Sequence, residues 1–199
     1  MEHAILSHDS PLIRAVRQGR VDEVAALLAG GADANKPKTD GSGTTPLIVA
    51  CKEGHAEIAT ALIAGGAKVN QARDDGTTPL SVACGKGHTE IATALIAAGA
   101  KVNQAMDGGA TPLFIACQGG HTEIAAALLA AGAKVNQARD NGATPLFAAC
   151  YNNNLSTVQL LLSYGASRAF VVLGMQTTAE GVAAQFGHDE LHAWLVRSR

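Results

Sequence analysis

The sequence predicts an all-α fold, a solenoid in which short helix–turn–helix repeats stack in a row. Near-identical segments recur at an interval of 33 residues, and each contains one of four prolines, Pro46, Pro79, Pro112 and Pro145. Within each segment, apolar residues follow the i, i+3, i+4 spacing of a helix, and glycines interrupt them at matching places. A fixed period of this length is typical of repeat proteins, in which a repeat buries its apolar face only by stacking on its neighbours.

The composition fits such a stack. Of the 199 residues, 47% are hydrophobic but only 4% are aromatic, so the core must consist mainly of Ala, Leu, Ile and Val. The formal net charge is −2, which is not the overall charge of a nucleic-acid-binding protein. No apolar run approaches the roughly 18 residues of a membrane span, and the start of the chain, MEHAILSHDS, does not resemble a secretory signal. We therefore expect an intracellular, cytoplasmic protein without membrane insertion.

The first helix of each central repeat is expected to follow a threonine. Thr45 and its equivalents suit an N-cap, and the proline after each fits the first helical position, where no backbone N–H is needed. This helix should end at a glycine, such as Gly54. The second helix should begin near a glutamate, such as Glu57, whose charge suits the helix dipole, and should end at a glycine such as Gly66. A turn containing glycine then leads to the next repeat.

Weaker copies of the pattern precede and follow the central four. Polar residues in these copies, such as Arg17 and Gln185, suit the outer face of a capping repeat. We expect one domain over residues 1–199. Its repeats are expected at about 9–39, 40–72, 73–105, 106–138, 139–172 and 173–199, of which the first and last are caps.

This pattern resembles the ankyrin repeat family. The resemblance covers about residues 9–199 and is carried by Thr-Pro-Leu, by the Ala-Cys and Gly-His pairs, by Glu-Ile and by Gly-Ala-x-Val-Asn. One departure is that the family's usual His after Thr-Pro-Leu is replaced, for example by Phe114 and Phe147. The resemblance implies a curved, right-handed stack of helix pairs with projecting β-turn loops. It also implies a non-enzymatic module (adaptor, inhibitor or effector) that binds another protein on its concave face and turn tips.

A thiol and an imidazole four residues apart, Cys117 and His121, raise the alternatives of a catalytic pair or a metal site. The same pair recurs in earlier repeats, as at Cys51 and His55, and a catalytic pair has no reason to recur at even spacing. A cysteine at an alanine-like position is a small buried hydrophobe. Zinc-type CxxC spacing and the usual nucleotide and hydrolase motifs are absent from the sequence. We therefore expect no enzymatic activity, no metal site, no cofactor and reduced thiols.

Positions that differ between otherwise similar repeats are the candidates for partner binding. Phe114, Phe147 and Tyr151 lie in consecutive repeats and should be neighbours. Two alternatives stay open for them: a contact patch, since aromatic residues are enriched at interface cores, or packing of the two Phe between repeats. The polar candidates on first helices and turn tips are Lys52, Lys86, Gln118, Asp74, Asp75, Asp107, Asp140 and Asn141.

Lysines and asparagines recur at equivalent positions of three repeats. We call these two sets ladders, and each has two interpretations. The lysines are either a solvated row or a basic row that meets an acidic partner. The asparagines either bond the turn or, as the resemblance implies, are sites for an asparagine hydroxylase. These ladders are Lys68, Lys101, Lys134 and Asn70, Asn103, Asn136.

We expect a monomer. The alternative function is a structural or self-associating array that has no discrete groove.

Overall fold

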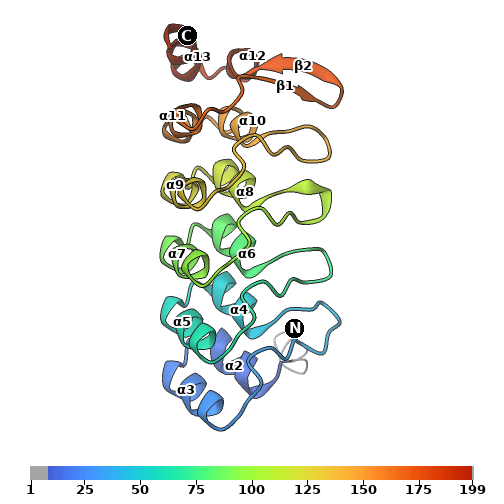
Figure 1. Cartoon of the computed structure of the whole chain (residues 1–199), viewed down its shortest axis with the longest axis vertical. Helices are drawn as coiled ribbons and strands as arrows, with labels where there is room; N and C mark the ends of the chain where they lie inside the picture. Colours follow the sequence, from blue (N-terminus) through green and yellow to red (C-terminus); the bar gives the residue numbers. More distant parts are fainter. Residues whose placement is uncertain (1–8, 199) are drawn as a thin grey trace. The chain divides into compact units, whose positions relative to one another are not determined.

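The computed structural model describes residues 9–198, in which helices alternate with projecting loops (Figure 1). Contacts divide the chain into two compact units, Met1–Lys101 and Val102–Arg199, here called the N-terminal and C-terminal units. Three helix pairs lie within the described part of each unit. The expected all-α solenoid is therefore confirmed. That all six repeats form a single domain stays a prediction.

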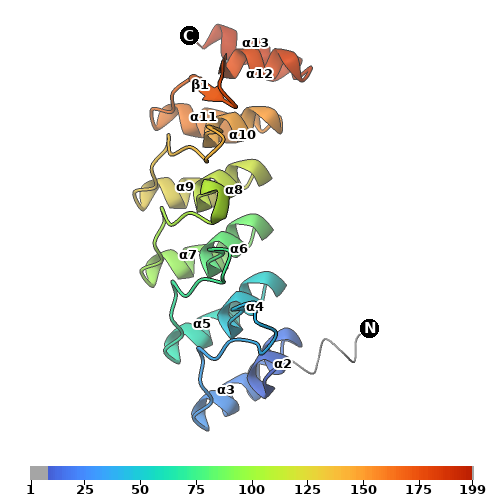
Figure 2. The same ribbon diagram turned by 90° about the vertical axis from the view of Figure 1, so that its right-hand side faces the viewer.

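In the N-terminal unit the first helices of the repeats pack in one row and the second helices in another (Figures 1 and 2). The first row contains α2 (Pro11–Arg17), α4 (Pro46–Glu53) and α6 (Pro79–Lys86). The second row contains α3 (Val21–Ala29), α5 (Ala56–Ala64) and α7 (Thr89–Ala97).

The C-terminal unit has the same two rows and, in addition, a short sheet. Its first helices are α8 (Pro112–Gly119), α10 (Pro145–Tyr151) and α12 (Ala179–Gln185). Its second helices are α9 (Thr122–Ala130), α11 (Leu155–Ser163) and α13 (Asp189–Arg197). A 3-10 turn, η2 (Asp107–Gly109), precedes α8, and the strands β1 (Ala169–Val172) and β2 (Met175–Thr178) precede α12.

Threonine caps begin the first helices of the central repeats, as expected. The hydroxyl of Thr45 accepts a hydrogen bond from the amide of Ile48 at 3.3 Å, and that of Thr144 accepts one from Phe147 at 3.2 Å. At the other end of α4, Gly54 adopts a left-handed conformation with φ 80°. Such a residue ends a helix cleanly because glycine has no Cβ to oppose this conformation.

An asparagine after the second helix links several of the repeats to the next one. The side chain of Asn103 donates to the carbonyl of Gly132 at 3.1 Å and accepts from the amide of Lys134 at 2.8 Å. Asn70 makes the same pair of bonds with Gly99 and Lys101, at 3.1 and 2.8 Å. These contacts favour the turn-bonding interpretation of the ladder, and hydroxylation of the asparagines stays a prediction.

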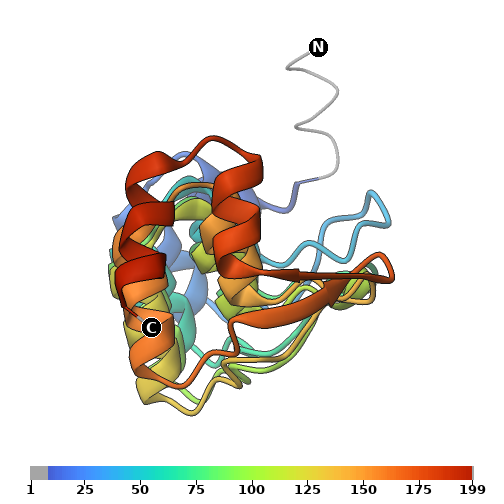
Figure 3. The same cartoon turned by 90° about the horizontal axis from the view of Figure 1, so that it is seen from above.

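The β1–β2 hairpin is a feature that the sequence did not lead us to expect, since only a projecting turn was expected there. The strands are antiparallel, and Val172 pairs with Met175 across a two-residue turn. Both turn residues, Leu173 and Gly174, have positive φ, at 52° and 78°. This is the backbone of a type I′ turn, whose twist matches that of paired strands. The hairpin projects away from α12 and α13 (Figure 3).

Candidate partner-binding surface

The cysteines of the repeats lie in the core. Cys51, Cys84, Cys117 and Cys150 are all fully buried. Burial raises the pKa of the Cys84 and Cys150 thiols to about 12. Because the thiolate is the nucleophile, thiols that are this hard to ionise are poorly suited to catalysis or metal binding at neutral pH.

The histidine positions support the ends of first helices. His55 Nε2 lies 3.5 Å from the carbonyl oxygen of Arg17, and His188 Nε2 lies 2.9 Å from that of Tyr151. In the fifth repeat Asn154 takes this place and donates to the carbonyl of Cys117 at 3.1 Å. Each side chain therefore reaches a carbonyl at the end of a first helix in the preceding repeat. Within residues 9–198, no group of three or more His, Cys, Asp or Glu side chains could hold a metal ion.

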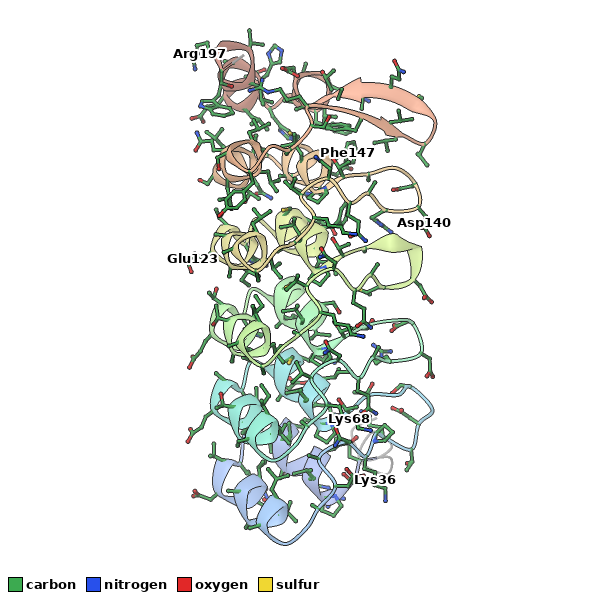
Figure 4. The ribbon with its side chains drawn as sticks, in the orientation of Figure 1. Lys36, Lys68, Glu123, Asp140, Phe147 and Arg197 are labelled. Carbon is green, nitrogen blue, oxygen red and sulfur yellow. The ribbon has the colours of Figure 1, made fainter. Side chains whose placement is uncertain are left out.

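Phe147 is the centre of an aromatic row on the C-terminal unit. Its ring stacks on Tyr151 with centroids 6.0 Å apart, and the edge of Phe170 lies against it at 5.7 Å. Tyr151 in turn meets Phe186 of the last repeat at 4.6 Å. We call Phe147, Tyr151 and Phe186 the aromatic row. In Figure 4, Phe147 lies between α10 and the neighbouring projecting loops.

Two of the three aromatic residues singled out in the sequence differ sharply in exposure. Phe114 is only 4% exposed and packs with Ala143 and Ala148. The guanidinium of Arg139 lies over its ring, 5.2 Å from the centroid, which is a cation–π contact. Tyr151 is 45% exposed. The burial of Phe114 fits the packing alternative, and Tyr151 fits a contact patch.

Five of the expected partner-binding residues line one pocket of about 140 Å³ in the C-terminal unit. These residues are Phe114, Gln118, Asn141, Phe147 and Tyr151. Asp140 is exposed on the loop beside this pocket, where its amide donates to the carbonyl of Gly108 at 3.2 Å (Figure 4). Asp107 is exposed in η2. The predicted residues of the C-terminal unit therefore gather around Phe147 and the adjoining turns.

The remaining expected residues belong to the N-terminal unit. Lys52 is exposed on α4 and lines a pocket of about 270 Å³, as do Lys38 and Arg73. Lys86 is exposed at the end of α6, and Asp74 is exposed in the turn before α6.

Asp75 has a structural role in that same turn. It accepts a hydrogen bond from the amide of Thr77 at 3.0 Å, and hydrogen bonds from Thr77 hold the pKa of its carboxyl below the ordinary value. Such a contact shapes the loop and leaves Asp75 less suited than Asp74 to bind a partner.

The lysine ladder is exposed at all three positions, Lys68, Lys101 and Lys134. Figure 4 shows Lys68 in the loop that follows α5. The backbone amide of each lysine is held by an asparagine of the preceding repeat, at 2.6 Å for Lys68 and 2.8 Å for the other two. The backbone of the ladder is therefore fixed while its ammonium groups face solvent.

A second groove begins at Phe147, and its exposed apolar residues were missed from the sequence. It has a volume of about 320 Å³ and lies between the hairpin and α12. Among the residues that line it, Leu173, Met175 and Phe186 are 72%, 68% and 42% exposed. A signal was present in the segment AFVVLGMQ, because the equivalent loops of earlier repeats carry Asp and Gly instead.

Comparison with known proteins addresses the chain as a whole. The family model described as ankyrin repeats (3 copies) matches residues 2–73, 62–139, 105–172 and 133–199. No curated protein matches the chain. No helix in the described part of the chain is long and apolar enough to cross a membrane.

Proposed function

We propose that this chain, which belongs to the ankyrin repeat family, binds a partner protein in the groove around Phe147 and at the turn tips beside it. Repeats of this family generally mediate protein–protein interaction, and the family is typically non-enzymatic. The observation that supports this location is the aromatic row, in which Tyr151 and Phe186 are almost half exposed although their rings contact each other.

Exposed aromatic side chains of this kind favour binding for two reasons. A ring of this size buries about 150–250 Å² when fully covered, and each buried Å² contributes about 25 cal/mol. The contact of Tyr151 with both Phe147 and Phe186 already restricts its ring, so less conformational entropy is lost when a partner covers it.

Polar residues surround the aromatic row in the manner of an interface rim. Gln118 and Asn141 line the same pocket as Tyr151, and Asp140 is exposed on the adjacent loop. A polar rim adds specificity while the aromatic centre supplies most of the binding free energy. Lys52, Lys86 and Asp74 are exposed on the N-terminal unit and are candidate contacts of that unit in its own right. The buried thiols suit a protein that acts in a reducing compartment.

Affinity capture from a lysate of the source cell, read by mass spectrometry, tests this proposal. The wild type is compared with a Tyr151→Ala, Phe186→Ala double variant. A matched control is Tyr164→Ala, because Tyr164 is 47% exposed but lies at the end of α11, in the other row of helices. We expect one partner to be captured by the wild type and the control and lost from the double variant.

Two other results would contradict the proposal. Equal capture of the same partner by all three proteins would show that binding does not use the aromatic row. Capture of nothing beyond the chain itself, with a mass in solution that rises with concentration, would favour a self-associating array.

A further inference from the structure

The last projecting loop of the described chain has an open strand edge. β1 is covered on one side, because the amide of Leu173 donates to the carbonyl of Asn141 at 2.8 Å and Val171 lies against Gly142. Its other side pairs with β2. Within residues 9–198 the sheet has only these two strands, so the outer edge of β2 has no neighbouring strand.

The side chains of β2 do not protect this edge. Natural sheet edges are usually shielded by charged residues, proline or a bulge. β2 reads MQTT, with neither a charge nor a proline, and Met175 is 68% exposed. An edge of this kind can accept an added strand, whose backbone supplies the missing hydrogen bonds.

The groove next to β2 selects for uncharged side chains. Its lining consists of apolar residues and of Gln176, Thr177 and Gln185, with no charged residue among them. A charged side chain placed there would lose hydration without gaining an opposite charge. Apolar side chains would instead contact Met175 and Phe186, which are both exposed in the structure.

We propose that β2 accepts an extended, uncharged and apolar segment of the partner protein as a third strand. Alternate side chains of that segment occupy the groove between the hairpin and α12, since successive residues of a strand point to opposite faces. This inference rests on the proposed function, because it identifies which part of the partner is bound and how.

A second copy of this chain is a less suitable occupant than a peptide segment. β2 has four residues, which at about 3.3 Å per residue makes an edge of about 13 Å. Two such edges paired with each other bury far less than the roughly 1,200 Å² of a stable interface. A free peptide segment, in contrast, can pair with the edge and fill the adjoining groove at the same time.

A peptide library displayed on phage and selected against the full chain tests this inference. We expect the selected peptides to be uncharged and to alternate apolar residues. The best one, labelled with a fluorophore, is then measured by fluorescence anisotropy. N-methylation at alternate residues that face β2 is expected to weaken binding at least tenfold, whereas N-methylation at the intervening residues leaves it unchanged. Met175→Glu is expected to weaken binding similarly, and Tyr164→Glu, at the exposed residue that follows α11, is the control.

The possible failures are distinguishable from failure of the proposed function. Binding that ignores every N-methyl group, or that survives Met175→Glu but is lost in the Tyr151→Ala, Phe186→Ala variant, overturns strand addition and leaves the aromatic row intact. Selection of charged peptides, or of none, also overturns it without affecting the capture experiment. A concentration-dependent mass that Met175→Glu abolishes overturns it in favour of a second copy.

Discussion

One buried carboxylate ties the start of the first repeat to its neighbours. Asp9 is buried, and its oxygens lie 2.9 Å from Arg17 Nε and 3.2 Å from Lys38 Nζ. Burial alone would raise its pKa, but hydrogen bonds from Arg17 and Lys38 outweigh this effect and hold the pKa of the carboxyl below its ordinary value of 3.8. A depressed pKa means that the ionised carboxyl stabilises the fold at neutral pH.

The Asp9→Asn substitution should therefore lower the free energy of unfolding at pH 7 by about 2 kcal/mol, because two cations lose their anion. The contribution of Asp9 is present above its unfolded pKa and disappears as the pH falls through the folded pKa, that is, below about pH 4. Urea unfolding at pH 7 and pH 3 measures both effects. The difference between wild type and variant should shrink at pH 3, and Asp74→Asn, at an exposed turn, serves as the control. A difference that is the same at both pH values would contradict this role.

The roles of individual residues could be predicted from the sequence where those roles depend only on neighbours within the same repeat. The threonine caps and the buried cysteines follow from position within one repeat. The difference between Phe114 and Tyr151 was not predictable in this way, because it depends on Arg139 and Ala143 of the next loop. Tyr151 was identified from the sequence because its position differs between repeats that are otherwise nearly identical. Leu173, Met175 and Phe186 were missed because the last repeat diverges so far that its equivalent positions are hard to compare.

Among the elements, the β1–β2 hairpin depends on its contact with the loop before it. Gly142 in that loop has φ 85°, and a Cβ added there would collide with the carbonyl oxygen of Val171 in β1. Gly132, at the end of α9, has a similar φ of 88° but no neighbouring atom within 4 Å of an added Cβ. Both glycines therefore need a positive φ, but only Gly142 lacks room for a Cβ atom.

Substituting each glycine by alanine separates these two contributions. Both variants should lose about 1 kcal/mol because alanine opposes positive φ. Gly142→Ala should lose at least about 1 kcal/mol more, since the backbone of the hairpin must move to relieve the collision. Urea unfolding of the two variants measures the difference. Equal losses would indicate that the loop and β1 are not in firm contact.

The sequence did not reveal this hairpin because its turn, Leu-Gly, lacks the Asn-Gly or Asp-Gly pair that usually marks a type I′ turn. Leu173 adopts a positive φ that a branched apolar residue rarely takes. The helices, in contrast, carry their caps and breakers in the sequence, and the structure confirms them.

At the scale of the whole molecule, the period determined the topology because every repeat must present the same apolar faces to its neighbours. The division into Met1–Lys101 and Val102–Arg199 could not be expected, since the sequence at this boundary follows the same period as elsewhere. It reflects the distribution of contacts, which the pattern of apolar residues does not encode.

Within each unit, the first repeat of the N-terminal unit and the last repeat of the C-terminal unit should open before the middle repeat, which is stacked on both sides. Hydrogen exchange read by mass spectrometry should therefore show faster exchange in α2 and α3 than in α5 of the N-terminal unit, and faster exchange in α13 than in α11 of the C-terminal unit. Uniform protection across all of these helices would instead indicate that the described repeats unfold as one cooperative block.

The asparagine ladder has a consequence for how such a chain can change in length. Asn70 and Asn103 find their partners 29 and 31 residues further along, whereas Asn35 finds Gly66 and Lys68 31 and 33 residues further along. Duplication or loss of a whole 33-residue segment leaves every donor in phase with an acceptor. A change of loop length is also compatible with these bonds, because Asn35 reaches Gly66 and Lys68 although the loop between them is two residues longer. The ladder thus joins neighbouring repeats whole and leaves the loops between them free to differ in length.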